Sequence, residues 1–129
     1  MKIEHVALYV ADLERAKGFY ETYFGAVAGE QYRNPNTGFM SYFLSFGAGC
    51  RLEIMARPDT KKRDKGRLDE GYAHLALAVG TRADVDALTA RLAKDGFEAA
   101  SGPRVTGDGY YESVVLDPEG NLVEIVEGT

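Results

Sequence analysis

The chain has a single cysteine, Cys50, and no apolar run long enough to cross a membrane. One cysteine excludes a disulfide within the chain and favours a reducing compartment. The first ten residues, MKIEHVALYV, lack the apolar stretch and small-residue cleavage site of a secretory signal peptide. We therefore expect a cytoplasmic protein without a membrane partner.

An excess of positive charge is also missing. The chain carries 15 Lys and Arg against 20 Asp and Glu, a formal net charge of −5. Because nucleic acid is a polyanion, it is not expected as a partner of this surface. The length of 129 residues corresponds to one domain, large enough to bury a core without disulfides.

The chain has only two histidines, and each opens one of two similar segments. His5 opens the segment HVALYV, and His74 opens HLALAV. A second pair of similar segments, RLEIM and LVEIV, contains Glu53 and Glu124. Chance similarity between apolar strands would explain one match, but it does not explain the pairing of both histidines and both glutamates. We infer two copies of one module.

Each copy predicts a strand, then a helix, then further strands. In the first copy, Asp12 is a candidate N-cap and Gly25 a candidate C-terminal stop for a helix. In the second copy, Thr81 and Asp84 resemble a capping box. The predicted helices cover residues 13–24 and 85–96, and the predicted strands cover 3–10, 38–47, 50–56, 72–80, 110–117 and 122–127.

The two histidines and two glutamates are candidate metal ligands. Side chains alternate along a strand, so all four are expected on the sheet face that the helices do not cover. Two neutral imidazoles and two carboxylates balance a divalent ion and suit nickel, cobalt, zinc, iron or manganese. The alternative is two solvated His–Glu pairs on an open sheet. The duplicated positions favour metal.

Three segments, HVALYVADLERAKGFYETYFG, GYAHLALAV and LDPEGNLVEIVE, resemble the vicinal oxygen chelate superfamily. That superfamily includes glyoxalase I, bleomycin-resistance proteins, fosfomycin-modifying thiol transferases, methylmalonyl-CoA epimerase and extradiol dioxygenases. The resemblance implies an α+β fold in which two tandem βαβββ modules form a curled mixed sheet around a metal. The single domain would comprise module one at about 1–57, a linker at about 58–70 and module two at about 71–129.

In many small members of this superfamily the modules pair across a homodimer. The resemblance then implies that His5 and Glu53 meet the second pair, His74 and Glu124, from a partner subunit. A complete His, Glu, His, Glu set is similar to that of glyoxalase I, and the short chain to its bacterial form. One divalent ion per site, Ni, Co or Zn, is the implied cofactor.

The same resemblance implies a lyase or isomerase that acts through a metal-bound enediolate. In glyoxalase I the substrate is the hemithioacetal of methylglyoxal and glutathione. Glu124 is the expected principal base, and Glu53 is expected to assist the return of the proton. A small-molecule substrate, with or without a thiol adduct, is the implied partner.

The residues expected to contact that substrate depart from the glyoxalase I pattern. Tyr9 stands where an arginine usually helps to bind glutathione, and Arg57 replaces a common asparagine. Arg57 and Arg104 could receive a carboxylate or a phosphate, so another acidic substrate stays open. Four further residues are candidate walls of the pocket, with ordinary packing or surface exposure as the alternative: Met40, Tyr42, Tyr110 and Tyr111.

Two other classes of function stay open at this point. One is a different metalloenzyme of the superfamily, such as an epimerase, a dioxygenase or a thiol transferase. The other is a non-catalytic protein of the bleomycin-resistance type that binds an antibiotic or another small molecule. Binders of that type usually lack the four ligands, so the ligand set favours an enzyme.

Overall fold

The computed structural model describes residues 1–128 and divides into two compact units. Unit one is Met1–Arg63 and unit two is Asp64–Thr129, of which residue 129 lies outside the described part. The predicted second module, 71–129, therefore includes one residue, 129, that lies outside the described residues. Each unit contains one helix and one mixed β-sheet.

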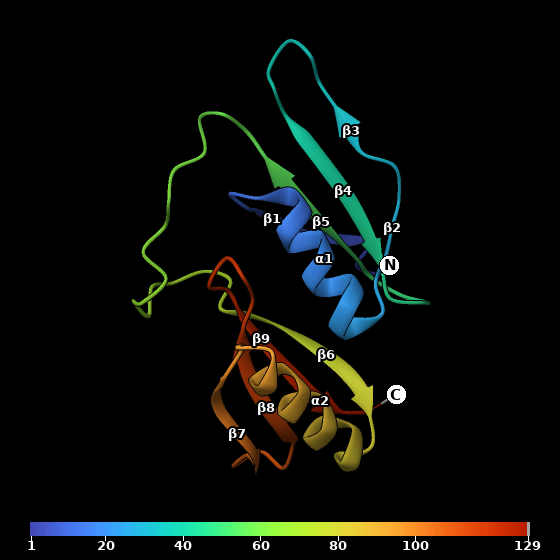
Figure 1. The fold of residues 1–129 in the computed structure, drawn as a ribbon, viewed down its shortest axis with the longest axis vertical. Helices are drawn as coiled ribbons and strands as arrows, with labels where there is room; N and C mark the ends of the chain where they lie inside the picture. The colour runs from blue at the N-terminus through green and yellow to red at the C-terminus, as the bar shows by residue number, and fades with distance from the viewer. Residues whose placement is uncertain (129) are drawn as a thin grey trace. The chain divides into compact units, whose positions relative to one another are not determined.

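In unit one, the sheet has the strand order β1-β5-β4-β2, with β3 also paired to β4. β1 runs parallel to β5, whereas the other pairs are antiparallel. Figure 1 shows α1 lying across β5 and β4. The elements of this unit are β1 (His5–Tyr9), α1 (Leu13–Phe24), β2 (Val27–Ala28), β3 (Tyr32–Arg33), β4 (Met40–Ser45) and β5 (Arg51–Ala56).

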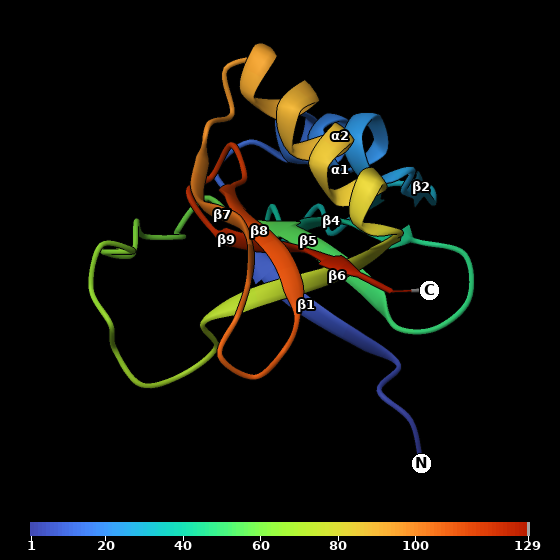
Figure 2. The same cartoon turned by 90° about the horizontal axis from the view of Figure 1, so that it is seen from below.

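Unit two repeats the plan with the strand order β6-β9-β8-β7. Here β6 runs parallel to β9, and the remaining pairs are antiparallel. Figure 2 shows α2 on one side of these strands. The elements are β6 (His74–Gly80), α2 (Arg82–Lys94), β7 (Ala99–Val105), β8 (Tyr111–Leu116) and β9 (Leu122–Glu127).

The capping residues explain why both helices begin where they do. Asp12 accepts a hydrogen bond from the backbone N–H of Arg15 at 2.9 Å, and Gly25 ends α1 with φ at 64°. Thr81 and Asp84 cap α2 reciprocally, each side chain accepting from the other residue's backbone N–H. Free N–H groups of the first turn are satisfied in both cases. The predicted caps and the bounds of α1 are confirmed, whereas α2 begins three residues and ends two residues before its predicted range of 85–96.

Each helix buries one stripe of side chains against its own sheet. In unit one, Tyr20 of α1 is buried with Leu44 and Ile54 from the strands. In unit two, Val85 and Leu92 of α2 are buried together with strand residues Val115, Val123 and Ile125. We call the sheet face that the helix covers the helix face, and the opposite sheet face the far face.

At one edge of each sheet, the strands β2, β3 and β7 carry no clear sequence signal and are not among the predicted strands. β2 and β3 are two residues each and pair with the two ends of β4, so together they form one interrupted edge strand. Their counterpart β7 contains Gly102 and Pro103, and its register with β8 shifts twice. Glycine and proline are depleted in regular strands, which hides such an edge from a pattern search.

The structure thus confirms the α+β class and the two βαβββ modules. Among residues 1–128, neither helix reaches the length and apolar character needed to cross a membrane.

Replacing Thr81 with alanine is expected to lower the free energy of unfolding by about 1 kcal/mol, because the N-cap acceptor of α2 is lost. Urea unfolding followed by circular dichroism measures the change. Thr60→Ala is the matched control, since Thr60 is exposed and bonds Arg57 only through its backbone N–H. Equal stability of the two variants would contradict the capping role.

Candidate functional site

The first His–Glu pair lies on the far face of unit one. Glu53 on β5 stands directly opposite Ala7 on β1, two residues after His5. The Nε2 atom of His5 lies 3.8 Å from Oε2 of Glu53. The Glu53 side chain is 14% exposed and that of His5 is 40% exposed. Leu52 and Ile54, the neighbours of Glu53, are buried on the helix face.

The second pair repeats this arrangement in unit two. Glu124 on β9 stands opposite Ala76 on β6, again two residues after the histidine. Nε2 of His74 lies 3.3 Å from Oε2 of Glu124. The parallel register is therefore duplicated together with the residue types. Alanine at both opposing positions leaves room for the carboxylate and the imidazole to approach each other diagonally.

The spacing of each pair suits two ligands of one divalent ion. Donors bound at about 2.1 Å stand about 3.0 to 3.4 Å apart when they occupy neighbouring positions of an octahedron or tetrahedron. The His74–Glu124 spacing falls in this range, and His5–Glu53 is slightly wider. Within either unit, no third His, Cys, Asp or Glu of the described residues completes a metal-binding group. Each unit thus provides half of the predicted four ligands.

His5 has a further set of contacts that the sequence analysis did not identify. Its Nδ1 atom contacts the carboxylate of Glu4, which also accepts a hydrogen bond from Arg51. The hydrogen bond from His5, followed by that from Arg51, holds the pKa of Glu4 below its usual value. The Phe43 ring meets the His5 ring edge-on at 5.3 Å between centroids. In the sequence, these contacts are indicated only by Glu4, the acidic residue directly before the candidate ligand His5.

Tyr9 and Arg57 lie together at the carboxyl ends of β1 and β5. Tyr9 is on the far face with His5, and both Asp59 and Tyr9 raise the pKa of Arg57, Asp59 most strongly. The Arg57 guanidinium donates two hydrogen bonds to Asp59, at 2.8 and 3.0 Å. Two predicted substrate contacts of this unit are therefore neighbours, and an internal carboxylate already binds the arginine.

Arg104 lies on the far face of unit two. It stands opposite Glu112 in the β7–β8 pair, with 3.7 Å between Nη1 and Oε1. Glu112 is two residues before Val114, which is the partner of Glu124, so both carboxylates share the face. Glu112 is only 8% exposed. Glu112 could not be selected from the sequence, because an isolated glutamate in an alternating strand is typical of a surface position.

Three of the remaining predicted contact residues lie on the helix faces. The hydroxyl of Tyr42 donates to Glu14 at 2.5 Å, and that of Tyr111 donates to Asp86 at 2.6 Å. These bonds to helix carboxylates raise the pKa of both tyrosines. Met40 shares the face of Tyr42 by strand alternation. Substrate contact by these residues stays a prediction, and within their own units the sheet separates them from the His–Glu pairs.

Tyr110 lies in the turn before β8 and is 57% exposed. Its backbone N–H donates to the hydroxyl of Thr106 at 3.0 Å. The position is accessible to a ligand, and its role also stays a prediction.

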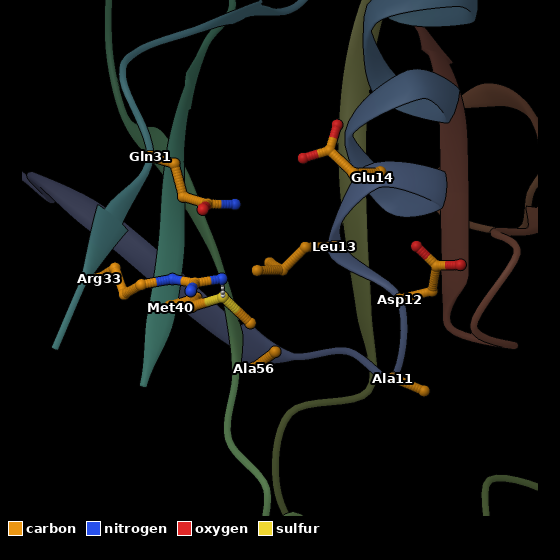
Figure 3. Close-up of a pocket in the computed structure, with 8 residues that line it drawn as sticks. All are labelled: Ala11, Asp12, Leu13, Glu14, Gln31, Arg33, Met40 and Ala56. Carbon is orange, nitrogen blue, oxygen red and sulfur yellow. Dashed lines mark hydrogen bonds between the residues drawn. The ribbon is translucent and has the colours of Figure 1, made fainter. Parts of the chain in front are cut away.

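Unit one also contains a cavity of about 360 Å³ on its helix face, at the start of α1. Figure 3 shows Leu13 pointing into it and the Arg33 guanidinium beside the sulfur of Met40. The lining residues are Ala11, Asp12, Leu13, Glu14, Gln31, Arg33, Met40 and Ala56. The cavity is thus on the opposite side of the sheet from His5 and Glu53.

Known proteins share this arrangement of modules. A model of the glyoxalase/bleomycin resistance protein/dioxygenase superfamily matches residues 2–125. The chain is 26% identical over 129 residues to a lactoylglutathione lyase of Escherichia coli O157:H7, covering 98% of this chain and 93% of that protein.

Solved structures give the same result for the fold. A glyoxalase family protein from Enterococcus faecalis superimposes with a TM-score of 0.81 at 25% identity, covering 98% of this chain and 97% of the other. The trypanothione-dependent glyoxalase I of Leishmania major gives 0.79 at 23% identity, covering 98% and 86%. Because the family model matches nearly the whole chain and both units contain the same module, the chain belongs to the glyoxalase/bleomycin resistance protein/dioxygenase superfamily.

Proposed function

We propose that the protein is a divalent-metal-dependent lyase or isomerase similar to glyoxalase I. Its substrate would be a hemithioacetal or a similar small molecule with two adjacent oxygens. The observation that carries the proposal is the His–Glu pair repeated at the same register in both units. The similarity to a lactoylglutathione lyase over nearly the whole chain supports the same reaction class.

The proposed ion is Ni, Co or Zn, with His5, Glu53, His74 and Glu124 as its ligands. Bound there, a divalent ion would polarise the substrate oxygens and stabilise the negative charge that develops when a carbon-bound proton leaves. Two neutral imidazoles and two carboxylates balance its charge. Because each unit supplies only two ligands, the proposal requires one unit from each of two chains, or both units of one chain.

The two glutamates also carry the proposed proton transfer. An Oε atom of Glu124 would accept the carbon-bound proton, and Glu53 would help to return a proton to the neighbouring carbon. Their side chains are only 14% and 20% exposed, so few water molecules would compete with a substrate for these carboxylates. The histidines would hold their position throughout as neutral donors.

Arg57 is the proposed contact for an acidic group of the substrate, with Tyr9 beside it. The guanidinium is already shaped for bidentate binding of a carboxylate, as its two bonds to Asp59 show. Arg104 is a second candidate on the far face of unit two. This arrangement also favours a second candidate function, a metalloenzyme of the same superfamily acting on an acid other than a glutathione adduct.

The location and assembly belong to the same proposal. The exposed, unpaired Cys50 supports a reducing, cytoplasmic environment. A homodimer with shared sites would bring the four ligands together from two chains. The His–Glu pair within each unit depends neither on the cytoplasmic location nor on the homodimer.

The decisive assay measures turnover of the hemithioacetal of methylglyoxal and glutathione by protein loaded with nickel, cobalt or zinc, with metal-free protein as the control. Metal-dependent formation of the thioester is expected. Metal binding without this turnover would favour the second candidate function, and binding of no divalent ion would favour a non-catalytic binder.

Glu53→Gln is expected to weaken divalent-ion binding about tenfold or more, because an anionic donor becomes neutral. The free energy of unfolding should change by no more than about 0.5 kcal/mol, since the side chain lies outside the core. Isothermal titration and urea unfolding measure the two quantities. Glu21→Gln, at an exposed position of α1, is the matched control. Wild-type affinity in the Glu53 variant would refute its role as ligand.

Mixing two defective variants tests whether the sites are shared between chains. His5→Ala and His74→Ala should each lose tight metal binding. In a dimer with shared sites, a dimer of one His5→Ala chain and one His74→Ala chain has all four ligands in one of its two sites. Refolding the variants together should therefore restore about a quarter of the wild-type sites. Restoration of none would contradict sharing between chains, and the separately refolded variants give the baseline.

Arg57→Leu is expected to raise KM for an acidic substrate about tenfold while leaving kcat nearly unchanged, because a charged contact common to substrate and transition state is removed. Steady-state kinetics separate the two constants. Arg67→Leu is the control, since Arg67 pairs with Asp69 at the same two-residue spacing in the linker. An unchanged KM would exclude Arg57 from the substrate site.

A further inference from the structure

The surroundings of the two candidate histidines differ, although their strand register is the same. Glu4 precedes His5, whereas Ala73 precedes His74. The direct strand partner of His5 is Arg51, whereas that of His74 is Leu122. The duplication therefore extends to the proposed ligands but not to the groups behind them.

Around His5, these groups form a connected set of contacts. One carboxylate oxygen of Glu4 contacts Nδ1 of His5, and the other accepts a hydrogen bond from Arg51. The backbone also fixes this arrangement, because the N–H of Arg51 donates to the carbonyl of Glu4 at 3.0 Å.

The Phe43 ring supports the same group of side chains. The Arg51 guanidinium lies 4.2 Å from the centroid of the Phe43 ring, whose edge contact with His5 was described above. The position equivalent to Phe43, opposite Glu124, is Val114. Alanine, leucine and valine side chains can neither accept a proton from an imidazole nor form an ion pair.

The contact with Glu4 has a chemical consequence for His5. A neutral imidazole carries one proton, on either Nδ1 or Nε2, and only the other nitrogen can bind a metal. A carboxylate facing Nδ1 favours the form with the proton on Nδ1. The lone pair is then on Nε2, which is the atom that faces Glu53.

We propose that Glu4, held by Arg51, is a positioning residue that fixes the tautomer and ring orientation of His5. It presents Nε2 to the ion before binding, whereas the residues at the equivalent positions around His74, Ala73, Leu122 and Val114, provide no such group. The use of this tautomer for metal binding rests on the proposed function. The positioning itself does not, because it is a property of the metal-free protein.

Nitrogen-15 NMR of the metal-free protein tests the positioning directly, since the chain contains only two imidazoles. At a pH where both imidazoles are neutral, the nitrogen shifts distinguish the two tautomers. His5 should carry its proton predominantly on Nδ1. In Glu4→Ala this preference should be lost while the His74 signals stay unchanged. A His5 preference that survives in Glu4→Ala would overturn the proposal.

Metal affinity provides the second readout. Glu4→Ala should weaken Ni²⁺ or Co²⁺ binding about tenfold, at the lower end of the loss seen when a partner behind a metal-bound histidine is removed, because Glu4 is exposed. Glu4→Gln retains an oxygen that accepts from Nδ1, so it should recover most of the affinity. Glu30→Gln, at an exposed position away from this group, is the control.

The outcomes separate this inference from the proposed function. If wild-type protein binds no divalent ion, the proposed function fails, and the NMR result still decides whether Glu4 positions His5. If wild-type protein binds the ion but Glu4→Ala binds it equally well, the positioning role in metal binding is overturned. Circular dichroism spectra of all variants establish that each remains folded.

Discussion

The parallel pairing of the first and last strands of each unit is the constraint on which the candidate site depends. It places alanine opposite glutamate, Ala7 with Glu53 and Ala76 with Glu124, and thereby sets each histidine diagonally beside a carboxylate. A register slip of one residue would turn the glutamates to the helix face, into the core. The buried residues on either side of each glutamate prevent such a slip, because apolar burial is lost if they move to the far face.

Duplication preserves the strand register and the candidate ligands, but the other residues of the two far faces differ. In unit one, charged and aromatic groups surround His5, among them Glu4, Arg51 and Phe43. In unit two, the corresponding positions are apolar, and an ion pair between the half-exposed Arg104 and the buried Glu112 lies further along the sheet. The far faces of the two units are therefore chemically different, although they are built on one scaffold.

The regular elements could be predicted because local signals and tertiary packing agree. α1 begins and ends at its predicted residues, since Asp12 accepts from the Arg15 backbone N–H and the Gly25 N–H donates to the Tyr20 carbonyl. Edge strands such as β7 could not be identified, because pairing across the sheet overrides the poor strand propensity of glycine and proline. The His–Glu pairs followed from alternation and the repeat. The contacts of Glu4 with Arg51 and of Glu112 with Arg104 depend on side chains from other strands, which a single sequence does not reveal.

The bidentate bond between Arg57 and Asp59 has a consequence for recognition at the end of β5. An acidic ligand that reached this guanidinium would exchange one anion for another and would not neutralise a bare cation. Charge alone would then contribute little selectivity among acids, because every acid would displace the same carboxylate. Discrimination would depend on the shape and reach of the incoming group, with Asp59 as the competitor that poorly fitting acids fail to displace.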